Sequence, residues 1–324
     1  MKKYRYLYPL LVVVAVLGAA IARNTGKGGF ASDSALMMDT LVQVSVWGKA
    51  RVSCEAGVDS AMSVLASFDR LLGDARIGPS EEAVLDEPEV QRIISVAAEV
   101  YRASGGLFDP TIGSVSRLWT FGEGGRVPRA ESVDVALERV SIARGLAGEG
   151  RGGSVLDLGG IAKGRAVEAA AGKLASLGFR SAIVAAGGDM RLVGRRPDGK
   201  PWRIAIRDPR REDGFIGYLE LEDTAVSTSG DYERFFMLGG RRFHHILDPR
   251  TGMPSGASVS VTAVAPEATV CDALSTAFFV MGPGDGSTLA ESMAGVGAVF
   301  LYAEGESLRV TGRLASKFER AVVE

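Results

Sequence analysis

Apolar residues recur along the chain at the spacings of both strands and helices. Residues 41–46 (Leu-Val-Gln-Val-Ser-Val) alternate apolar and polar side chains, which indicates a strand with one buried face. Apolar residues three or four positions apart predict one helix over 58–72 and a second over 90–101. Gly105 and Gly106 follow the second helix, and glycine directly after a helix is a common C-terminal signal. The first part of the chain is therefore predicted to hold a strand followed by two amphipathic helices.

In the second half of the chain the predicted elements become shorter and closer together. Residues 155–158 and 182–185 are apolar runs that indicate buried strands, and a helix over 161–177 between them predicts a βαβ-like unit. A helix over 269–281 and a hairpin around 304–306 are predicted to end the fold. The strands expected before that helix cover 203–207, 218–221, 243–247 and 258–264. Strands in runs, interrupted by a few helices, favour the α+β class over a doubly wound sheet.

The N-terminal residues have the composition of an export signal. Basic residues precede a short apolar run over 8–22 that ends in small side chains, which predicts a secretory signal peptide or an uncleaved N-terminal anchor in residues 1–22. Small and polar residues at 23–35 predict a linker, and 36–324 is predicted to be the folded domain. We therefore expect an exported protein, periplasmic or anchored to the outer face of the cytoplasmic membrane.

Composition narrows the class of protein. A formal net charge of −2 over 324 residues argues against a nucleic-acid-binding surface, which is normally basic. Cys54 and Cys271 are the only cysteines, and two isolated cysteines make no disulfide framework, so we expect two buried free thiols. The 42 glycines are scattered, which predicts many tight turns and places where backbone approaches a ligand closely.

Several segments carry side chains suited to binding charged groups. Asp157 ends a predicted strand, two glycines follow, and Lys163 lies in the first turn of the next helix. Such a turn can bind an anion through free N–H groups and the lysine charge. The alternative is an ordinary strand–helix turn with a solvated lysine. Asp109, Asp189 and Asp231 stand beside glycines, where aspartate commonly bonds its own neighbouring backbone.

Asp272 and Thr276 are candidates for a metal site. They are four positions apart on a predicted helix and therefore share one face. A carboxylate and a hydroxyl are hard oxygen donors, which suit Mg²⁺ when water and substrate phosphates complete its shell. The alternative is a helix with a polar stripe that holds no metal.

The two histidines are adjacent in a predicted strand, so their side chains should point to opposite faces. At most one of His244 and His245 is then expected to face a site. A strand histidine is also commonly a hydrogen-bonded structural residue, so the pattern alone does not choose between the two.

Six segments together resemble the ApbE family of flavin transferases, in the family's order and over about residues 38–283. They are Ser104-Gly105-Gly106-Leu107-Phe108-Asp109-Pro110-Thr111, the DLGGIAKG run at 157–164, Ala186-Gly187-Gly188-Asp189, Thr228-Ser229-Gly230-Asp231-Tyr232-Glu233, His245-Ile246-Leu247-Asp248-Pro249-Arg250-Thr251-Gly252 and Asp272-Ala273-Leu274-Ser275-Thr276-Ala277. The resemblance implies an α+β fold of mixed sheets with packed helices, and an FAD cleft between two fused lobes. It also implies a Mg²⁺-dependent FAD:protein FMN transferase that releases AMP.

The resemblance assigns roles to particular residues. The side chains of Asp272 and Thr276 and the carbonyl of Gly160 would hold Mg²⁺, and His245, directly before Ile-Leu-Asp-Pro, would be the catalytic base. The residues implied to line the FAD pocket are Met38, Leu107, Phe108, Asp109, Asp157, Lys163 and Ile246. The implied partner is an acceptor flavoprotein with a Thr or Ser flavinylation site, such as a subunit of a membrane redox complex.

The chain departs from the family pattern at two places. Asp39 stands where the family usually has glycine between methionine and threonine, and the usual Ser-Arg-Leu-Asn-type stretch is missing over 71–85. Two other functions fit the same residues. Water in place of the acceptor would make the protein an FAD pyrophosphatase, and loss of chemistry would leave a periplasmic FAD-binding protein. A redox flavoenzyme is disfavoured, because no strand–GxGxxG–helix fingerprint occurs.

Overall fold

The computed structural model describes residues 28–321, apart from 74, 79–80, 144–154, 212 and 303–306. The predicted signal segment at 1–22 and the tip of the closing hairpin at 304–306 lie outside the described residues. No helix within the described ranges is long and apolar enough to cross a membrane.

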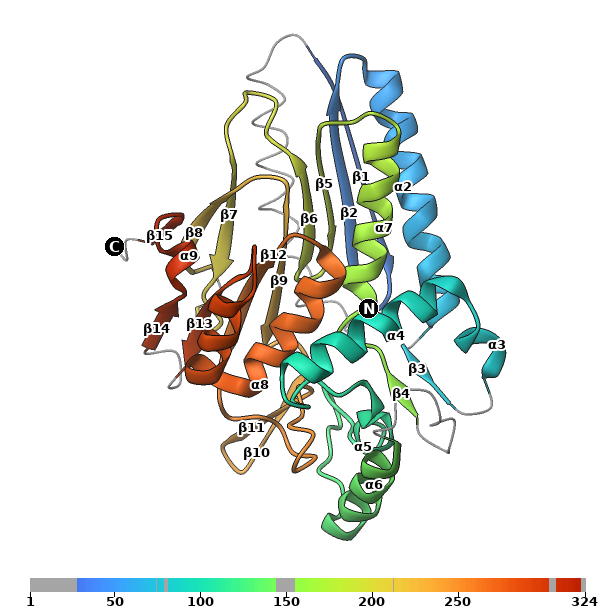
Figure 1. The fold of residues 1–324 in the computed structure, drawn as a ribbon, viewed down its shortest axis with the longest axis vertical. Coiled ribbons are helices and arrows are strands. Elements are labelled where there is room, and N and C mark those ends of the chain that lie inside the picture. The colour runs from blue at the N-terminus through green and yellow to red at the C-terminus, as the bar shows by residue number, and fades with distance from the viewer. Residues whose placement is uncertain are drawn as a thin grey trace.

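An eight-stranded sheet forms the centre of the molecule (Figure 1). In order across the sheet, its strands are β1 (Gly29–Met37), β2 (Thr40–Gly48), β5 (Ser181–Ala186), β6 (Asp189–Gly194), β9 (Thr224–Gly230), β12 (Ser260–Ala265), β13 (Gly297–Tyr302) and β14 (Ser307–Val310). All pairings among them are antiparallel, so this sheet is not mixed as the resemblance implied.

Strand β1 corrects the prediction of a linker over 23–35. Small polar residues gave no apolar alternation in this segment, yet residues 29–37 pair along their whole length with β2. Ser32 Oγ lies 2.9 Å from Ser45 Oγ across the pair. An edge strand needs only backbone partners on one side, so its side chains can stay polar.

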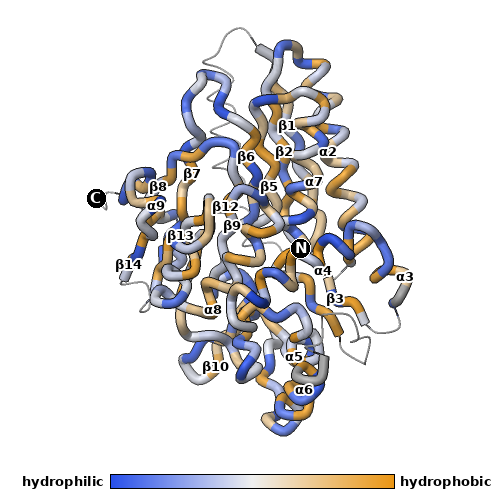
Figure 2. The backbone as a smooth tube through the Cα atoms, in the orientation of Figure 1, coloured by the Kyte–Doolittle hydropathy of each residue, from blue (hydrophilic) through white to orange (hydrophobic). Residues whose placement is uncertain are grey.

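Helices cover one face of the large sheet (Figure 1). Those packed on its strands are α2 (Arg51–Leu72), α7 (Ala162–Ser176) and α8 (Ala268–Ser292), and α4 (Pro88–Ala103) packs on α8. The long apolar helix α8 bends at Gly282, whose φ of 78° lies in the left-handed region that favours glycine. The central strands and the helices above them carry the apolar segments of the chain (Figure 2).

A second sheet covers the opposite face of the large one. It consists of β7 (Trp202–Arg207), β8 (Phe215–Leu221) and β15 (Phe318–Arg320). Trp202 and Leu219 from this sheet share a buried cluster with Trp47 and Ile183 from the large sheet. The ring centroids of Trp47 and Trp202 are 5.3 Å apart, which fixes the two layers against each other.

A smaller lobe has its own core. The helices α5 (Gly113–Ser116) and α6 (Ala130–Ala143) and the hairpin of β10 (Phe235–Leu238) and β11 (Arg241–His244) supply its buried residues. Phe236 and Phe243 stack across the hairpin with ring centroids 5.3 Å apart. The remaining short elements are β3 (Arg76–Ile77), α3 (Glu82–Leu85), the 3₁₀ helix η1 (Pro110–Ile112) and β4 (Leu156–Asp157). Near the C-terminus, α9 (Gly312–Ala315) packs on β13.

The expected βαβ-like unit is not formed. Strand β4 pairs with β3 in a separate two-stranded sheet, whereas β5 pairs antiparallel with β2 and β6. Apolar runs on both sides of a helix predicted the three elements correctly, but strand partners depend on distant residues that the local pattern does not contain. Cys54 and Cys271 are buried free thiols, as expected.

Gly164 sets the distance between α7 and α8. A Cβ at this position would lie 2.3 Å from the carbonyl oxygen of Ala268 and 2.6 Å from Cβ of Asp272. We expect Gly164→Ala to lower the free energy of unfolding by about 1–3 kcal/mol, because the two helices must move apart. Urea unfolding followed by circular dichroism measures the change.

Gly172 provides the matched control for this prediction. It lies exposed on the same helix, with no atom within 4 Å of a Cβ built there. Gly172→Ala should raise the free energy of unfolding by about 0.5–1 kcal/mol, because alanine loses less backbone entropy in a helix. Equal stability of the two variants would show that the close approach of α7 and α8 has no structural cost.

Candidate active site

A cavity of about 1500 Å³ opens between the large sheet, the second sheet and the smaller lobe. Every residue to which the resemblance assigns a role lines it, which brings together five separate parts of the chain. They are Met38, Leu107, Phe108, Asp109, Asp157, Gly160, Lys163, His245, Ile246, Asp272 and Thr276.

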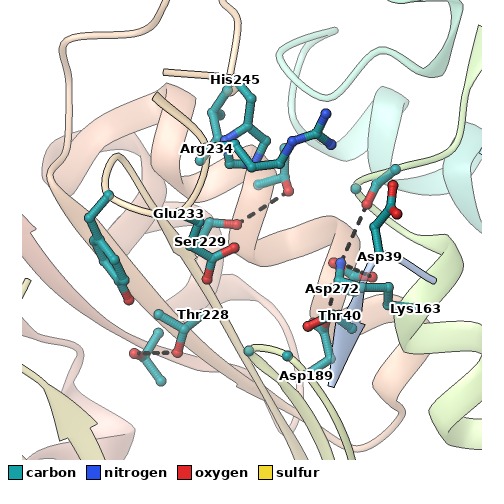
Figure 3. Close-up of a pocket in the computed structure, with 18 of the residues that line it drawn as sticks. Asp39, Thr40, Lys163, Asp189, Thr228, Ser229, Glu233, Arg234, His245 and Asp272 are labelled. Carbon is teal, nitrogen blue, oxygen red and sulfur yellow. Dashed lines mark hydrogen bonds and ion pairs between the residues drawn. The ribbon is translucent and has the colours of Figure 1, made fainter. Parts of the chain in front are cut away.

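Lys163 binds two carboxylates in the floor of the cavity (Figure 3). Its Nζ is 3.0 Å from Oδ2 of Asp189 and 3.8 Å from Oδ2 of Asp272. Burial alone would lower the pKa of Lys163, but Asp189 and then Asp272 raise it above its ordinary value. Lys163 therefore stays charged, and its charge is already offset by protein carboxylates.

This arrangement differs from both interpretations of the turn before α7, because Lys163 is ion-paired rather than solvated and two of the N–H groups are already hydrogen-bonded. The N–H of Gly164 donates to Asp272 Oδ2 at 2.8 Å, and the N–H of Gly159 donates to Asp157 Oδ1 at 3.0 Å. Ser116 donates to the other oxygen of Asp157 at 2.5 Å. These N–H groups are therefore hydrogen-bonded, and Lys163 is ion-paired, to carboxylates of the protein. The local sequence could not indicate this, because Asp189 and Asp272 lie far along the chain.

Asp272 and Thr276 lie on α8 and face the cavity, as their spacing predicted. Gly160 lies beside them, because a Cβ built on it would be 3.1 Å from Thr276 Oγ1. Burial and then the nearby Asp189 raise the pKa of Asp272 above its ordinary value. A buried carboxylate of this kind gains from a cation placed against it.

The donor set fits a hard cation. One carboxylate, one hydroxyl and one backbone carbonyl are oxygen ligands of the kind that Mg²⁺ accepts, together with water and phosphate oxygens. Within the described residues no group of three or more His, Cys, Asp and Glu side chains could hold a metal. The set formed by Asp272, Thr276 and the Gly160 carbonyl has one such side chain, so it does not depend on a group of that kind.

The two histidines diverge as expected. His244, the last residue of β11, is buried, with Nε2 2.9 Å from the carbonyl oxygen of Ser255 and its ring 5.4 Å from that of Phe279. His245 follows the strand and lines the cavity (Figure 3). Its ring lies edge-on to that of Phe121. Its Nδ1 has no hydrogen-bond partner among the described residues. Of the two histidines, His245 is therefore the one that faces the cavity.

His245 is neutral in the free protein. Burial, followed by the positive charge of Arg234, lowers the pKa of His245 to about 3. The imidazole is thus in the form that accepts a proton at any physiological pH, although a low pKa makes it a weak base. An anionic ligand beside the ring would raise this pKa and strengthen the base.

The turn aspartates have distinct roles. Asp109 bonds its own neighbourhood, accepting from the N–H of Thr111 at 2.9 Å and from its hydroxyl at 2.6 Å, which is the turn chemistry expected of it. Asp231 instead forms a bidentate pair with Arg210, with N–O distances of 2.9 and 2.7 Å. Asp189, expected only in a turn, is the principal partner of Lys163.

The cavity is also lined by residues that no sequence pattern indicated. Glu233 lines the cavity opposite Lys163, and desolvation raises its pKa to about 7. Trp119 and Phe121 stack with ring centroids 5.7 Å apart on the side of the smaller lobe. The segment 71–85, which lacks the family stretch, contributes Arg76 to the cavity lining. Glutamate in the TSGDYE segment was the one available signal, because the other residues have no distinctive local pattern.

The departure at Asp39 has a conformational explanation. Met38 and Asp39 both have positive φ, 52° and 56°, in the turn between β1 and β2. Aspartate tolerates this region better than most residues, so it can replace glycine there. The N–H of Met38 donates to Asp69 Oδ1 at 2.6 Å, which holds the turn at the cavity.

An α+β fold with one large cavity, in which carboxylates, hydroxyls and a neutral histidine converge, is typical of an enzyme. Comparison with known proteins identifies the family. The ApbE family matches residues 38–300. The chain therefore belongs to the ApbE family.

Relatives are found in several bacteria. The FAD:protein FMN transferase of Rhodobacter capsulatus is 32% identical over 328 residues, which is 94% of this chain and 61% of that protein. The chain thus spans less than two thirds of that relative. The protein of the same name from Vibrio cholerae is 31% identical over 264 residues, covering 74% of this chain and 79% of that one.

Solved structures share the fold. The ApbE protein of Thermotoga maritima superposes with a TM-score of 0.73 at 28% identity, covering 89% of this chain and 99% of that one. The flavinyl transferase ApbE of Pseudomonas stutzeri, in its apo form, gives 0.72 at 28% identity and covers 92% and 100%. The α+β class predicted from the sequence is confirmed.

Proposed function

We propose that the protein is a Mg²⁺-dependent FAD:protein FMN transferase, which cleaves FAD to AMP and attaches FMN to a Thr or Ser of an acceptor flavoprotein. The single observation that carries the proposal is the convergence of the predicted metal ligands and His245 on one cavity. The names of the relatives from Rhodobacter capsulatus and Vibrio cholerae support it. FAD is the substrate in this proposal, and AMP is the leaving group.

The cavity has the size and lining for a dinucleotide. Small-molecule sites usually measure about 300–1,000 Å³, and this cavity of about 1500 Å³ leaves room for a segment of an acceptor beside FAD. Leu107, Phe108 and Ile246, with Met38 from the β1–β2 turn, offer apolar surface to a flat ring. The polar floor around Lys163 would then lie under the pyrophosphate, with Asp109 and Asp157 holding the turns that shape it.

The oxygen ligands would stabilise the charge that develops on the pyrophosphate. Asp272, Thr276 and the carbonyl of Gly160 would hold Mg²⁺, which supplies charge neutralisation to the phosphate oxygens when bound. Lys163 keeps Asp189 and Asp272 in place, because it is ion-paired with both. These residues therefore bind and orient, and they take no proton in the reaction.

His245 would act on the acceptor. The hydroxyl oxygen of the acceptor Thr or Ser forms a bond to the phosphorus of the FMN half, and the bond from that phosphorus to the bridging oxygen breaks. The bridging oxygen keeps the electron pair and leaves as part of AMP. His245 accepts the proton that the hydroxyl loses, which is a role for a neutral imidazole.

Two other functions use the same site and remain as outcomes of the test. Attack by water would give free FMN and AMP, and a protein without chemistry would leave FAD intact. Incubation with FAD, Mg²⁺ and a threonine-containing acceptor, followed by separation of products, distinguishes the three. AMP with labelled acceptor supports the transferase, AMP with free FMN the pyrophosphatase, and unchanged FAD a binding protein. We also propose export, so that the acceptor would be an extracytoplasmic protein.

Activity should depend on a divalent cation. The proposed ligands are all hard oxygens, so EDTA should abolish AMP release, and Mg²⁺ should restore it far better than Zn²⁺. Chromatography of AMP after chelation and add-back measures this. Full activity after exhaustive chelation would rule out the metal assignment.

A further inference from the structure

A chain of hydrogen-bonded hydroxyls, the hydroxyl chain, joins Asp189 to Thr276 through three buried serines. Ser227 Oγ lies 2.5 Å from Asp189 Oδ1 and 3.0 Å from Ser275 Oγ. Ser229 Oγ lies 2.8 Å from Ser275 Oγ and 3.3 Å from Thr276 Oγ1. The serines are at most 9% exposed. The chain therefore runs through the protein interior from the partner of Lys163 to a proposed metal ligand.

The position of these hydroxyls is unusual for a helix–sheet interface. Ser227 and Ser229 are two positions apart on β9, so both face α8, where Ser275 and Thr276 lie. Apolar side chains normally fill such an interface. Buried hydroxyls are tolerated only when hydrogen-bonded, and here they bond one another. The proposed catalytic steps assign no role to the three serines.

Each hydroxyl has one hydrogen and can donate only one hydrogen bond, which sets the donor at each contact along the hydroxyl chain. A carboxylate only accepts, so Ser227 donates to Asp189, which is ion-paired with Lys163. Ser227 is also placed to donate to Ser275 at 3.0 Å, but the shorter contact with the carboxylate takes its single hydrogen. Ser275 donates to the carbonyl oxygen of Asp272, which is 2.9 Å away. Ser275 then has no hydrogen left for Ser229, so Ser229 donates to Ser275.

The Thr276 hydroxyl, at the end of the hydroxyl chain, has a defined orientation. The hydrogen of Ser229 is used by Ser275, so the contact between Ser229 and Thr276 requires Thr276 to donate. The hydrogen of Thr276 then points into the protein, and the free lone pair of its oxygen is left for the cavity, where Gly160 approaches it. A hydroxyl in this orientation is arranged to accept a cation.

We infer that the hydroxyl chain is a positioning device, which orients the Thr276 hydroxyl as an acceptor for the bound cation. The inference rests on the proposed function, because it assumes that Thr276 is a metal ligand. Residues that orient a ligand typically change metal affinity by 10–100-fold when they are removed. Ser229 and Ser275 are therefore expected to govern cation affinity without contacting the cation.

Mn²⁺ binding to the full chain without FAD tests the inference. Electron paramagnetic resonance of free Mn²⁺ gives the affinity directly, and Mn²⁺ prefers the same hard oxygen ligands. Ser229→Ala and Ser275→Ala should each weaken Mn²⁺ binding by about 10–100-fold, with unchanged thermal unfolding. Ser229→Thr keeps a hydroxyl and should restore the wild-type affinity.

Ser287→Ala is the matched control, because Ser287 is equally buried on α8 but bonds only the carbonyl of Pro283 in its own helix. It should leave Mn²⁺ affinity within about twofold of wild type, well short of the expected 10–100-fold loss. In a Thr276→Val background, Ser229→Ala should cause no further loss, because the hydroxyl that it orients is gone. A further loss in that background would show that Ser229 acts by another route and would overturn the inference.

The remaining outcomes separate the inference from the proposed function. If Mn²⁺ binds the wild type but not Asp272→Asn, and Ser229→Ala and Ser275→Ala bind it as tightly as the wild type, the metal site stands and the hydroxyl chain has no positioning role. If the wild type and Asp272→Asn bind Mn²⁺ equally, or neither binds it, the metal assignment itself is wrong. In that case the inference fails with it.

Discussion

Asp272→Asn should lower the rate of AMP release by about 10²–10³-fold, equivalent to about 2.7–4 kcal/mol of transition-state stabilisation. Asparagine keeps the shape of the side chain and an oxygen that can accept from the N–H of Gly164, but it removes the charge that would hold a divalent cation. The apolar lining of the cavity is unchanged, so FAD affinity should change much less than the rate. Steady-state AMP release and FAD titration measure the two quantities.

Stability separates this effect from misfolding. Burial raises the pKa of Asp272 in the folded protein, so the folded state binds more protons than the unfolded state above the usual aspartate pKa. The stability that this group contributes is present at low pH and is lost as pH rises through the raised pKa. Without a metal, Asp272→Asn should therefore unfold at the same temperature as wild type or higher at pH 8. A large drop in unfolding temperature would indicate a structural role instead.

Asp285→Asn is the control on the same helix. Asp285 lies exposed on α8, beyond the bend at Gly282 and away from the cavity lining. Its substitution should leave AMP release within about twofold, because surface changes of this kind usually stay within about 0.5 kcal/mol. Wild-type turnover by Asp272→Asn would place the ligand elsewhere.

The sequence predicted the elements better than their partners. The helix over 58–72 and the strand over 41–46 have periodic apolar positions, and both appear in the structure. The prediction that this strand has only one buried face is wrong, because Gln43 and Ser45 on its other face are 8% and 2% exposed. Strand β1 lacked such a signal, because an edge strand is held by backbone hydrogen bonds. The pairing of β4 with β3 rather than β5 depends on contacts between distant segments, which the local pattern does not contain.

In the candidate site, too, the sequence predicted individual residues better than their partners. The residues predicted from the family motifs all line one cavity. The four-residue spacing correctly predicted that Asp272 and Thr276 share one helix face. The role of Lys163 could not be read locally, since its partner Asp189 is on another strand. The serines of the hydroxyl chain were missed for a similar reason. Serine in a strand or helix carries no periodic signal, and its function depends on what the neighbouring element places opposite it.

His245→Ala should lower FMN attachment to an acceptor peptide by about 10²–10⁴-fold, which is the usual contribution of a positioned base. FAD affinity should change little. Because the pKa of His245 in the free protein is about 3, the side chain is already neutral at pH 5, so kcat/KM, which reports the free enzyme, should show no acid limb from this group between pH 5 and 8. Mass spectrometry of a threonine-containing acceptor, incubated with FAD and Mg²⁺ at several pH values, measures the rate.

His244 supplies the internal control, because it is adjacent in sequence but buried on the other side of the strand. His244→Ala should retain transfer activity if it stays folded, although the carbonyl of Ser255 loses a partner, which costs about 1–3 kcal/mol of stability. His244→Gln can still donate a hydrogen bond to that carbonyl, so it serves as a second control if His244→Ala unfolds. Equal loss of transfer in His245→Ala and His244→Gln would point to a folding effect. Loss of transfer in the His244 variants alone would assign the base to His244, and its side chain would then have to turn toward the cavity in the active protein.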